Sequence, residues 1–209
     1  MTTLLDDSDA SLDIAAEALA AGKLLAFPTE TVYGLGARAD DEIAVQAIFR
    51  AKGRPEDKPL IVHVRDEAQA RRFVAAWPDC AARLARAFWP GPLTLVLPKA
   101  PSVGDAVTRG GATVAVRAPA HPLAVRLLAR TPLAIAAPSA NLSGEPPART
   151  ASDVVAALDG RVDYVLDGGP TGDRAPSTIV DLTALDGRAT VLRDGAIRRD
   201  ELARFLEIR

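Results

Sequence analysis

Residues 27–64 read FPTETVYGLGARADDEIAVQAIFRAKGRPEDKPLIVHV, and the interpretation of the whole chain starts from this stretch. The apolar run of residues 24–27 predicts a strand that ends at Pro28. The polar segment after the strand is predicted to be a loop, because it is rich in hydroxyl groups and glycine: Thr29, Thr31, Tyr33, Gly34 and Gly36.

A helix is predicted next, with Asp40 or Asp41 as its N-cap. One face of this helix is expected to be apolar at helical spacing: Ile43, Ala44, Ala47, Ile48 and Ala51. Residues 52–58 then form a cationic loop, and residues 59–64 form a second short strand that carries His63 near its end. A strand, a polar loop, a helix and a cationic loop in succession are typical of an α/β protein that builds an anion site at its strand ends.

The length predicts that residues 1–209 form one large domain, or a domain with a short appendage, and the composition supplies enough apolar residues (48%) to fill a core of aliphatic side chains. The net charge of −2 and the pI of about 5.7 argue against a protein that holds nucleic acid by bulk charge. Cys80 is the only cysteine, so no internal disulfide and no cysteine-based metal site is expected. We find no signal-peptide pattern and no apolar run long enough for a membrane span, and therefore expect a cytoplasmic protein without membrane contact.

The rest of the chain alternates between helical and strand patterns. Helices are predicted over residues 11–21, 66–77, 79–89, 122–129, 150–160 and 200–206. Strands are predicted over residues 93–97, 113–116, 133–137, 164–166, 178–181 and 189–192. The last strands have no helices between them, so the fold class is α/β with a mixed sheet flanked by helices.

Four cations lie close together at the end of the helix predicted around residues 43–51 and in the loop after it: Arg50, Lys52, Arg54 and Lys58. They are open to two interpretations, a solvated helix end that offsets the helix dipole or a phosphate clamp. Gly53 and Pro55 favour the clamp, because they impose irregular backbone between the charges. Neither GxxxxGK[ST] nor a strand-linked GxGxxG is present, so a nucleotide site would have to be built from scattered loop residues.

The histidines and the PSAN segment are further candidates. His121 precedes Pro122 and is predicted to begin a helix. His63 ends a strand, and the strand ends of an α/β sheet are where such proteins bind substrates. Two histidines without HExxH spacing disfavour a zinc site. Ser139 and Asn141 either form a turn or face the same way into a site, and a Ser-His-Asp hydrolase is a weaker alternative because the GxSxG elbow is absent.

Six segments taken in order carry a resemblance across residues 10–195: PTETVYGLG, KGRP with Lys58 and PLIVH, TVAVR, PSAN with SG, PSTIVD, and VLRDG. Together they resemble the YrdC-like threonylcarbamoyl-AMP synthase family, in its short, single-domain form. The resemblance implies a twisted mixed sheet with a concave, basic groove. It also implies a nucleotidyltransferase that converts L-threonine, bicarbonate or CO2, and ATP into threonylcarbamoyl-AMP and pyrophosphate. The tRNA threonylcarbamoyl transferase machinery would then use that product to make threonylcarbamoyladenosine (t6A) in tRNA.

The resemblance also assigns expected roles to individual residues. The positions matching the family's threonine site are Thr31, His63, Arg117 and Ser177. Those matching its ATP site are Arg54, Lys58, Thr113, Ser139, Asn141 and Arg193, and Lys52 with Arg54 forms the paired element expected to be catalytic. Two departures are expected to matter: Ala137 stands where several relatives have a hydroxyl residue, and Lys58 stands where some have Asn.

Mg²⁺ is the expected cofactor, brought by the triphosphate of ATP rather than held in a protein cage. The alternative function, from the class of binding proteins rather than enzymes, is a double-stranded RNA or tRNA-binding module that uses the same basic groove. Net charge and sparse aromatic residues count against that role, although weak RNA binding stays open. An ATP hydrolase or kinase is a third alternative, distinguished by ATP turnover without threonine or bicarbonate.

Overall fold

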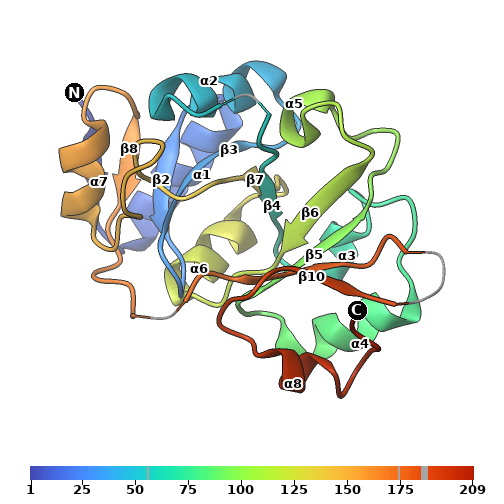
Figure 1. Cartoon of the computed structure of the whole chain (residues 1–209). Helices are drawn as coiled ribbons and strands as arrows, with labels where there is room; N and C mark the ends of the chain where they lie inside the picture. The colour runs from blue at the N-terminus through green and yellow to red at the C-terminus, as the bar shows by residue number, and fades with distance from the viewer. Residues whose placement is uncertain (56, 174, 185–187) are drawn as a thin grey trace.

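The computed structural model describes residues 1–55, 57–173, 175–184 and 188–209 (Figure 1). Its elements in chain order are β1 (Thr3–Leu5), α1 (Asp9–Ala20), β2 (Leu25–Pro28), β3 (Tyr33–Arg38), α2 (Glu42–Lys52), β4 (Ile61–His63), α3 (Glu67–Ala70), α4 (Asp79–Phe88), β5 (Leu93–Pro98), α5 (Asp105–Thr108), β6 (Thr113–Arg117), α6 (Pro122–Arg130), β7 (Ile135–Ala136), α7 (Ala151–Leu158), β8 (Tyr164–Leu166), β9 (Thr178–Asp181), β10 (Thr190–Arg193) and α8 (Arg199–Leu202).

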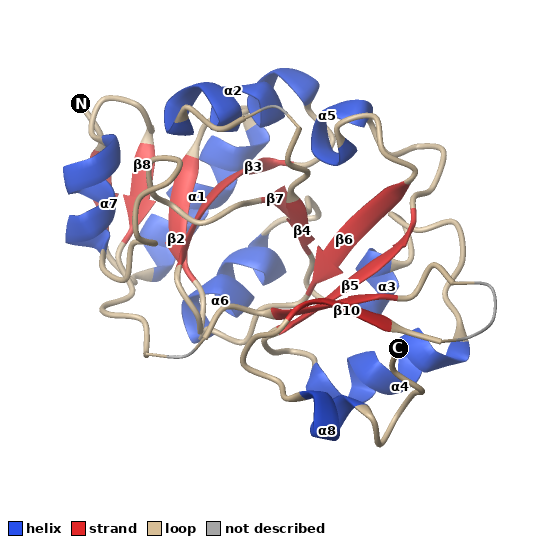
Figure 2. Ribbon diagram, in the orientation of Figure 1, coloured by secondary structure: helices blue, strands red, loops and turns tan. Residues whose placement is uncertain are grey.

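The strands form one twisted sheet with helices on both sides (Figure 2). Its order is β1-β8-β2-β3-β7-β4-β6-β5-β9-β10. The sheet contains both parallel pairs, such as β4/β6 and β5/β9, and antiparallel pairs, such as β2/β3 and β5/β6. The predicted α/β class and mixed sheet are therefore confirmed.

Alternate residues of β2 enter two separate cores, as the period of a strand requires. Ala26 packs in the larger core, together with apolar residues of α2, α4, α5 and α7. Leu25 and Phe27 pack in the smaller core, whose helical residues come from α1 and α6. The sheet is thus a middle layer between two helical layers.

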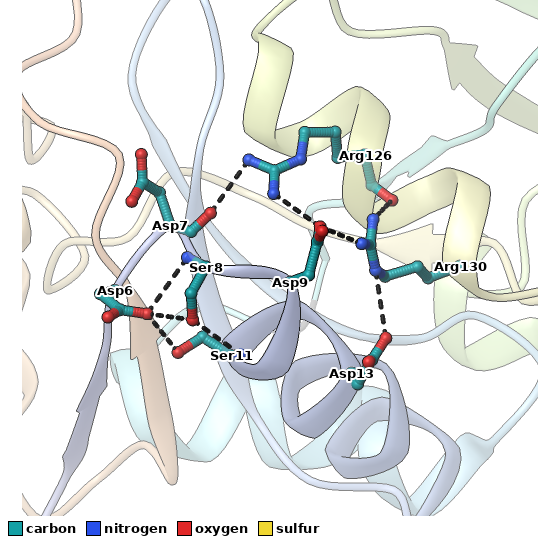
Figure 3. Close-up of polar contacts among 8 residues, drawn as sticks. All are labelled: Asp6, Asp7, Ser8, Asp9, Ser11, Asp13, Arg126 and Arg130. Carbon is teal, nitrogen blue, oxygen red and sulfur yellow. Dashed lines mark hydrogen bonds and ion pairs between the residues drawn. The ribbon is translucent and has the colours of Figure 1, made fainter.

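Polar contacts join α1 to α6 along their exposed sides (Figure 3). Asp9 pairs with both Arg126 and Arg130, and Arg130 also contacts Asp13 at 3.1 Å. These carboxylates are exposed, so solvent screens the pairs and they orient the helices more than they stabilise them. The packing of α1 against α6 is stabilised mainly by the apolar contacts beneath these ion pairs.

The segment Tyr33–Arg38 was predicted as a loop and is a strand instead. It pairs antiparallel with β2, and its Gly34 and Gly36 are strand residues rather than turn residues. A Cβ on Gly36 would lie 2.5 Å from Ile135 Cγ2 and 2.9 Å from Phe27 Cε1. Glycine is present here because β3 passes close to its neighbours, which is a packing requirement that mimics a turn signal.

Several predicted boundaries also differ. Asp41 is the N-cap of α2, but Ile43 is exposed, and the buried face instead includes Val45 and Phe49. The helix predicted over residues 66–77 is only α3, and the strand predicted over residues 133–137 is only β7. The sequence interpretation missed β1 and α5. In the part of the chain that the structure describes, no helix is both long and apolar enough to cross a membrane.

Candidate functional site

A cavity of about 350 Å³ opens where several strands end. The parallel strands β4 and β6 place His63 opposite Arg117 in register, so both side chains reach the same edge of the sheet. The loop between β2 and β3 supplies Thr31, and the segment after β7 supplies Ser139. Ligands of open α/β sheets bind at such edges, so this cavity is the candidate site.

Eight residues singled out from the sequence line this cavity: Thr31, Arg54, His63, Arg117, Ser139, Asn141, Ser177 and Arg193. They come from positions as far apart as 31 and 193, and the sheet brings them together. Their individual roles toward threonine and ATP remain predictions.

Arg117 lies at the deep end of the cavity, with only 4% of its surface exposed. Its Nε donates to the carbonyl oxygen of Gly91 at 3.3 Å, and its Nη2 donates to Thr31 Oγ1 at 3.3 Å. The same Nη2 forms an ion pair with Glu30 Oε1 at 2.8 Å. A buried guanidinium with a charged partner is suited to bind a carboxylate.

Ser177 and Arg193 form a second polar group on the wall. The Ser177 hydroxyl lies 2.8 Å from Thr94 Oγ1 and accepts from Arg193 Nη2 at 2.9 Å. Arg193 Nε also donates to the Ser177 carbonyl oxygen at 3.0 Å. Burial, and then the charge of Arg117, lower the pKa of the Arg193 guanidinium. The serine is thereby fixed in place at the start of β9.

His63 is fully buried, and burial followed by the nearby Arg117 charge lowers the pKa of its imidazole to about 3. Its ring packs edge-on against Phe27, with centroids 5.8 Å apart. Its Nδ1 has no hydrogen-bond partner among the described residues. The neutral ring can therefore offer a hydrogen bond to a ligand, but it does not add a positive charge.

Arg54 is the cation of the KGRP loop that reaches the cavity. Its Nη2 donates to the Pro59 carbonyl oxygen at 3.3 Å, while its buried Nε has no partner among the described residues. Burial lowers the pKa of this guanidinium, an effect partly opposed by the charge of Asp57. A buried donor without a protein acceptor is suited to an anionic ligand.

Lys52 does not line the cavity, although the sequence predicts it to act there with Arg54. Its side chain is buried, with 2% exposed, and its Nζ donates to the carbonyl oxygens of Ser139 and Asn141. Burial, and then the charge of Arg54, lower the pKa of Lys52 to about 8. The ammonium thus contacts the PSAN segment from outside the lining, and its catalytic role with Arg54 remains a prediction.

Three other predicted cations or hydroxyls also lie outside the cavity lining: Arg50, Lys58 and Thr113. Arg50 and Lys58 are exposed. Thr113 begins β6 and pairs with Pro98, at the opposite end of the strand from Arg117. Four cations close in sequence therefore separate in space, because the helix end and the turn direct them differently.

Asn141 is nearly buried, and its Nδ2 donates to the carbonyl oxygens of Leu142 and Glu145 at 2.7 Å each. Its Oδ1 has no partner among the described residues. The turn predicted from the PSAN segment and the site predicted there are both compatible with this geometry. The turn orients the amide, and Asn141 as a residue lines the cavity.

Sequence reasoning missed other residues of the wall and its support. Thr29, Val32, Leu60, Pro147, Ile179 and the carboxylate-bearing Glu145 line the cavity, and Glu30 and Thr94 support Arg117 and Ser177. Glu30 and Thr29 lie beside Thr31 in the polar segment after the first strand, so their position could have indicated a place in the site. Thr94 lies within β5, where the sequence pattern indicates only a strand. Among the described residues, the lining contains three arginines and one carboxylate, and the expected basic groove remains a prediction.

Among the described residues, no group of three or more His, Cys, Asp and Glu side chains is placed to hold a metal ion. Glu145 is the carboxylate in the lining. This donor set does not make a protein cage for Mg²⁺, which commonly binds through substrate phosphates and water.

The comparisons with known proteins agree with this geometry. A family model, Sua5/YciO/YrdC, described as "Telomere recombination", matches residues 17–195. The chain is 48% identical over 197 residues to the threonylcarbamoyl-AMP synthase of Pyrococcus abyssi, covering 94% of this chain and 57% of that protein. It is 46% identical over 203 residues to the enzyme of the same name from Bacillus subtilis, covering 97% of this chain and 58% of that protein.

The structure is also similar to that of P. abyssi Sua5 complexed with L-threonine, with a TM-score of 0.93 and 43% identity. The match covers 100% of this chain and 62% of that one. The chain thus spans less than two thirds of the length of these relatives. The family model nevertheless covers most of the chain, so this protein belongs to the Sua5/YciO/YrdC family.

Proposed function

We propose that the chain is a threonylcarbamoyl-AMP synthase, a nucleotidyltransferase that makes threonylcarbamoyl-AMP and pyrophosphate from L-threonine, CO2 or bicarbonate, and ATP. One observation carries the proposal: a single cavity is lined both by the buried, ion-paired Arg117 and by Arg54, whose buried Nε has no partner among the described residues. We assign a carboxylate to the first and the phosphates to the second. The names of the relatives and the threonine complex of a neighbour support the choice of substrates.

The reaction needs two anions to meet, and the cavity is suited to that task. The threonine amine first combines with CO2 to give a carbamate and releases a proton. A carbamate oxygen then attacks the α-phosphorus of ATP, and pyrophosphate leaves with the bonding electrons. Positioning and electrostatic stabilisation account for most of the acceleration in such a transfer.

Arg117 would bind the amino-acid carboxylate, with Thr31 and Ser177 beside it for the hydroxyl and amine. Neutral His63 would offer a hydrogen bond in the same region without repelling the ammonium group of the incoming amino acid. Fixed donors of this kind require little reorganisation when the substrate binds.

Arg54 would bind the phosphates through its unpartnered Nε, with Ser139 and Asn141 on the facing wall. Lys52 would act through the carbonyl oxygens of that wall rather than by touching the nucleotide. Mg²⁺, bound to the triphosphate, would neutralise part of its charge. The product would pass to the tRNA threonylcarbamoyl transferase machinery.

Release of pyrophosphate in mixtures that each lack one component tests this proposal. We expect release only when L-threonine, bicarbonate and ATP are all present. An ATP hydrolase or kinase would consume ATP without threonine, and an RNA-binding module would not consume it in any mixture. Either result would contradict the proposed synthase.

A further inference from the structure

The Arg117 guanidinium is held by the protein on two of its three nitrogens. Nε donates to the Gly91 carbonyl oxygen, and Nη2 contacts both Glu30 and Thr31. Among the described residues, Nη1 makes no hydrogen bond to the protein. Since Arg117 lines the cavity, Nη1 is the nitrogen left to meet a ligand there.

Glu30 holds Arg117 from behind the cavity wall. Its Oε2 accepts from the backbone N–H of Ala120 at 3.1 Å, and its Oε1 lies 2.8 Å from Arg117 Nη2. The side chains of Glu30 and Arg117 are only 10% and 5% exposed, and Glu30 is not among the residues that line the cavity. One carboxylate oxygen is therefore held by a hydrogen bond, and the other is held by the ion pair with Arg117, without a hydrogen bond among the described residues.

The pair also controls the charge at this end of the cavity. Arg117 lies close enough to Arg193 and His63 to lower the pKa of each, after the larger effect of burial. A buried guanidinium without a counter-charge is strongly unfavourable. Glu30 supplies that counter-charge at 2.8 Å from Nη2.

We propose that Glu30 is a positioning residue for the amino-acid substrate, fixing Arg117 so that Nη1 is presented to the substrate carboxylate in one direction. The inference rests on the proposed function, because it takes an amino acid as the ligand of Arg117. A donor with one fixed direction distinguishes L-threonine from D-threonine, whose carboxylate is displaced when its other groups are held. Glu30 would thus affect affinity and stereoselectivity without touching the substrate.

The test uses Glu30→Gln in the full chain. A Gln side chain has the same shape, but its amide nitrogen must face either the N–H of Ala120 or the N–H of Arg117, so one anchor is lost. Glu67→Gln is the matched control, because it breaks an exposed pair with Arg71 on α3, away from the cavity. Calorimetric titration would measure the binding of L-threonine, D-threonine and ATP to each protein.

We expect Glu30→Gln to weaken L-threonine binding by about tenfold or more, because the buried Arg117 guanidinium loses its charged partner and is no longer held in one direction. The preference for L-threonine over D-threonine should fall, while ATP binding should stay within about twofold of wild type, a change too small to be one lost hydrogen bond. Glu67→Gln should bind all three ligands as wild type does. Unchanged L-threonine affinity and selectivity in folded Glu30→Gln would overturn the inference.

Glu30→Asp is the second variant, since it keeps the charge but is too short to reach both anchors. It should also lose selectivity between the two threonines. Equal loss of ATP and threonine binding in both variants would show a merely structural role and would overturn the inference. A wild-type chain that does not bind L-threonine would contradict the proposed function itself, whereas a failure confined to the Glu30 variants would contradict this inference alone.

Discussion

At the scale of single residues, three cavity-lining side chains each have a buried polar atom without a protein partner. These atoms are Arg54 Nε, His63 Nδ1 and Asn141 Oδ1. Buried polar groups are nearly always paired in folded proteins, since an unpaired one costs about 1–3 kcal/mol. The two other such atoms among the described residues, Glu30 Oε1 and Trp77 Nε1, belong to residues outside the lining. The three lining residues support the proposal that this cavity binds a polar ligand.

Replacing Arg54 with alanine should impair adenylate formation and leave the fold intact. The loss of one or two charge-assisted hydrogen bonds to phosphate, about 1.5–3 kcal/mol each, predicts a fall of at least tenfold in kcat/KM. Arg50→Ala is the control. Arg50 is exposed near the end of α2, just before the loop that carries Arg54, and it does not line the cavity. Wild-type turnover by a folded Arg54→Ala protein would disprove the role assigned to this arginine.

His63 predicts a pH dependence of stability. Its pKa is about 3 in the folded chain and 6.5 as the ordinary value, so the unfolded chain binds more protons between these two values. The free energy of unfolding should therefore fall as the pH falls through this window, and rise as the pH rises.

Urea titrations of wild type and His63→Gln at several pH values measure this contribution. The free energy of unfolding of the wild-type chain should fall more steeply than that of His63→Gln as the pH falls below about 6.5, the ordinary pKa of histidine. Parallel curves for the two proteins would show that His63 does not titrate differently in the folded state.

At the scale of elements, the end of α2 is joined to the segment after β7 by Lys52. The Nζ group donates to the carbonyl oxygens of Ser139 and Asn141, and the Lys52 carbonyl oxygen accepts from the Ser143 N–H at 3.0 Å. The buried ammonium has a desolvation cost, as its lowered pKa shows. It thus contributes more to the shape of the wall than to the stability of the fold.

Lys52→Met should therefore loosen residues 139–145 while changing overall stability little. The methionine removes the desolvation cost but leaves two carbonyl oxygens without their donor, and these effects oppose each other. Hydrogen exchange should become faster in this segment, and ATP-dependent turnover should fall. Lys23→Met, which breaks an exposed pair with Asp163, is the control. Unchanged exchange in residues 139–145 would contradict the tethering role.

Gly36 provides a test of the sheet itself. Gly36→Ala should destabilise the protein by about 1–3 kcal/mol, because the new methyl group would overpack the contact with Ile135 and Phe27. Gly104→Ala is the control, since a Cβ there meets nothing within 4 Å. Equal denaturation midpoints for the two variants would show that β3 does not pack as closely as described.

The sequence predicted most elements correctly where the pattern was strong. The strand carrying His63, the strand ending at Arg117 and the helix beginning after Thr150 are all present. It failed where one residue type has two uses: Gly36 of β3 serves close packing rather than a turn. Spacing alone also could not show that Lys52 and Arg54, two residues apart, lie on opposite sides of the cavity wall, because Gly53 is in the left-handed region (φ +58°) and redirects the chain between them.

At the scale of the whole molecule, the sheet brings residues from the first and last quarters of the chain to one cavity. Thr31 follows β2, whereas Ser177 and Arg193 belong to the β9 and β10 region. The net charge of the chain is −2, and three of its 25 lysines and arginines, Arg54, Arg117 and Arg193, line this cavity. This arrangement favours a nucleotide-sized anion over a long nucleic acid.

The central claim is that this cavity joins threonine, CO2 and ATP into one adenylate. Mass spectrometry of a reaction containing L-threonine, ATP and ¹³C-bicarbonate tests it most directly. The account predicts an adenylate of the mass of threonylcarbamoyl-AMP that carries the heavy carbon and is missing when threonine is omitted. ATP that stays intact, or that is converted to ADP or AMP without any labelled adenylate, would contradict it.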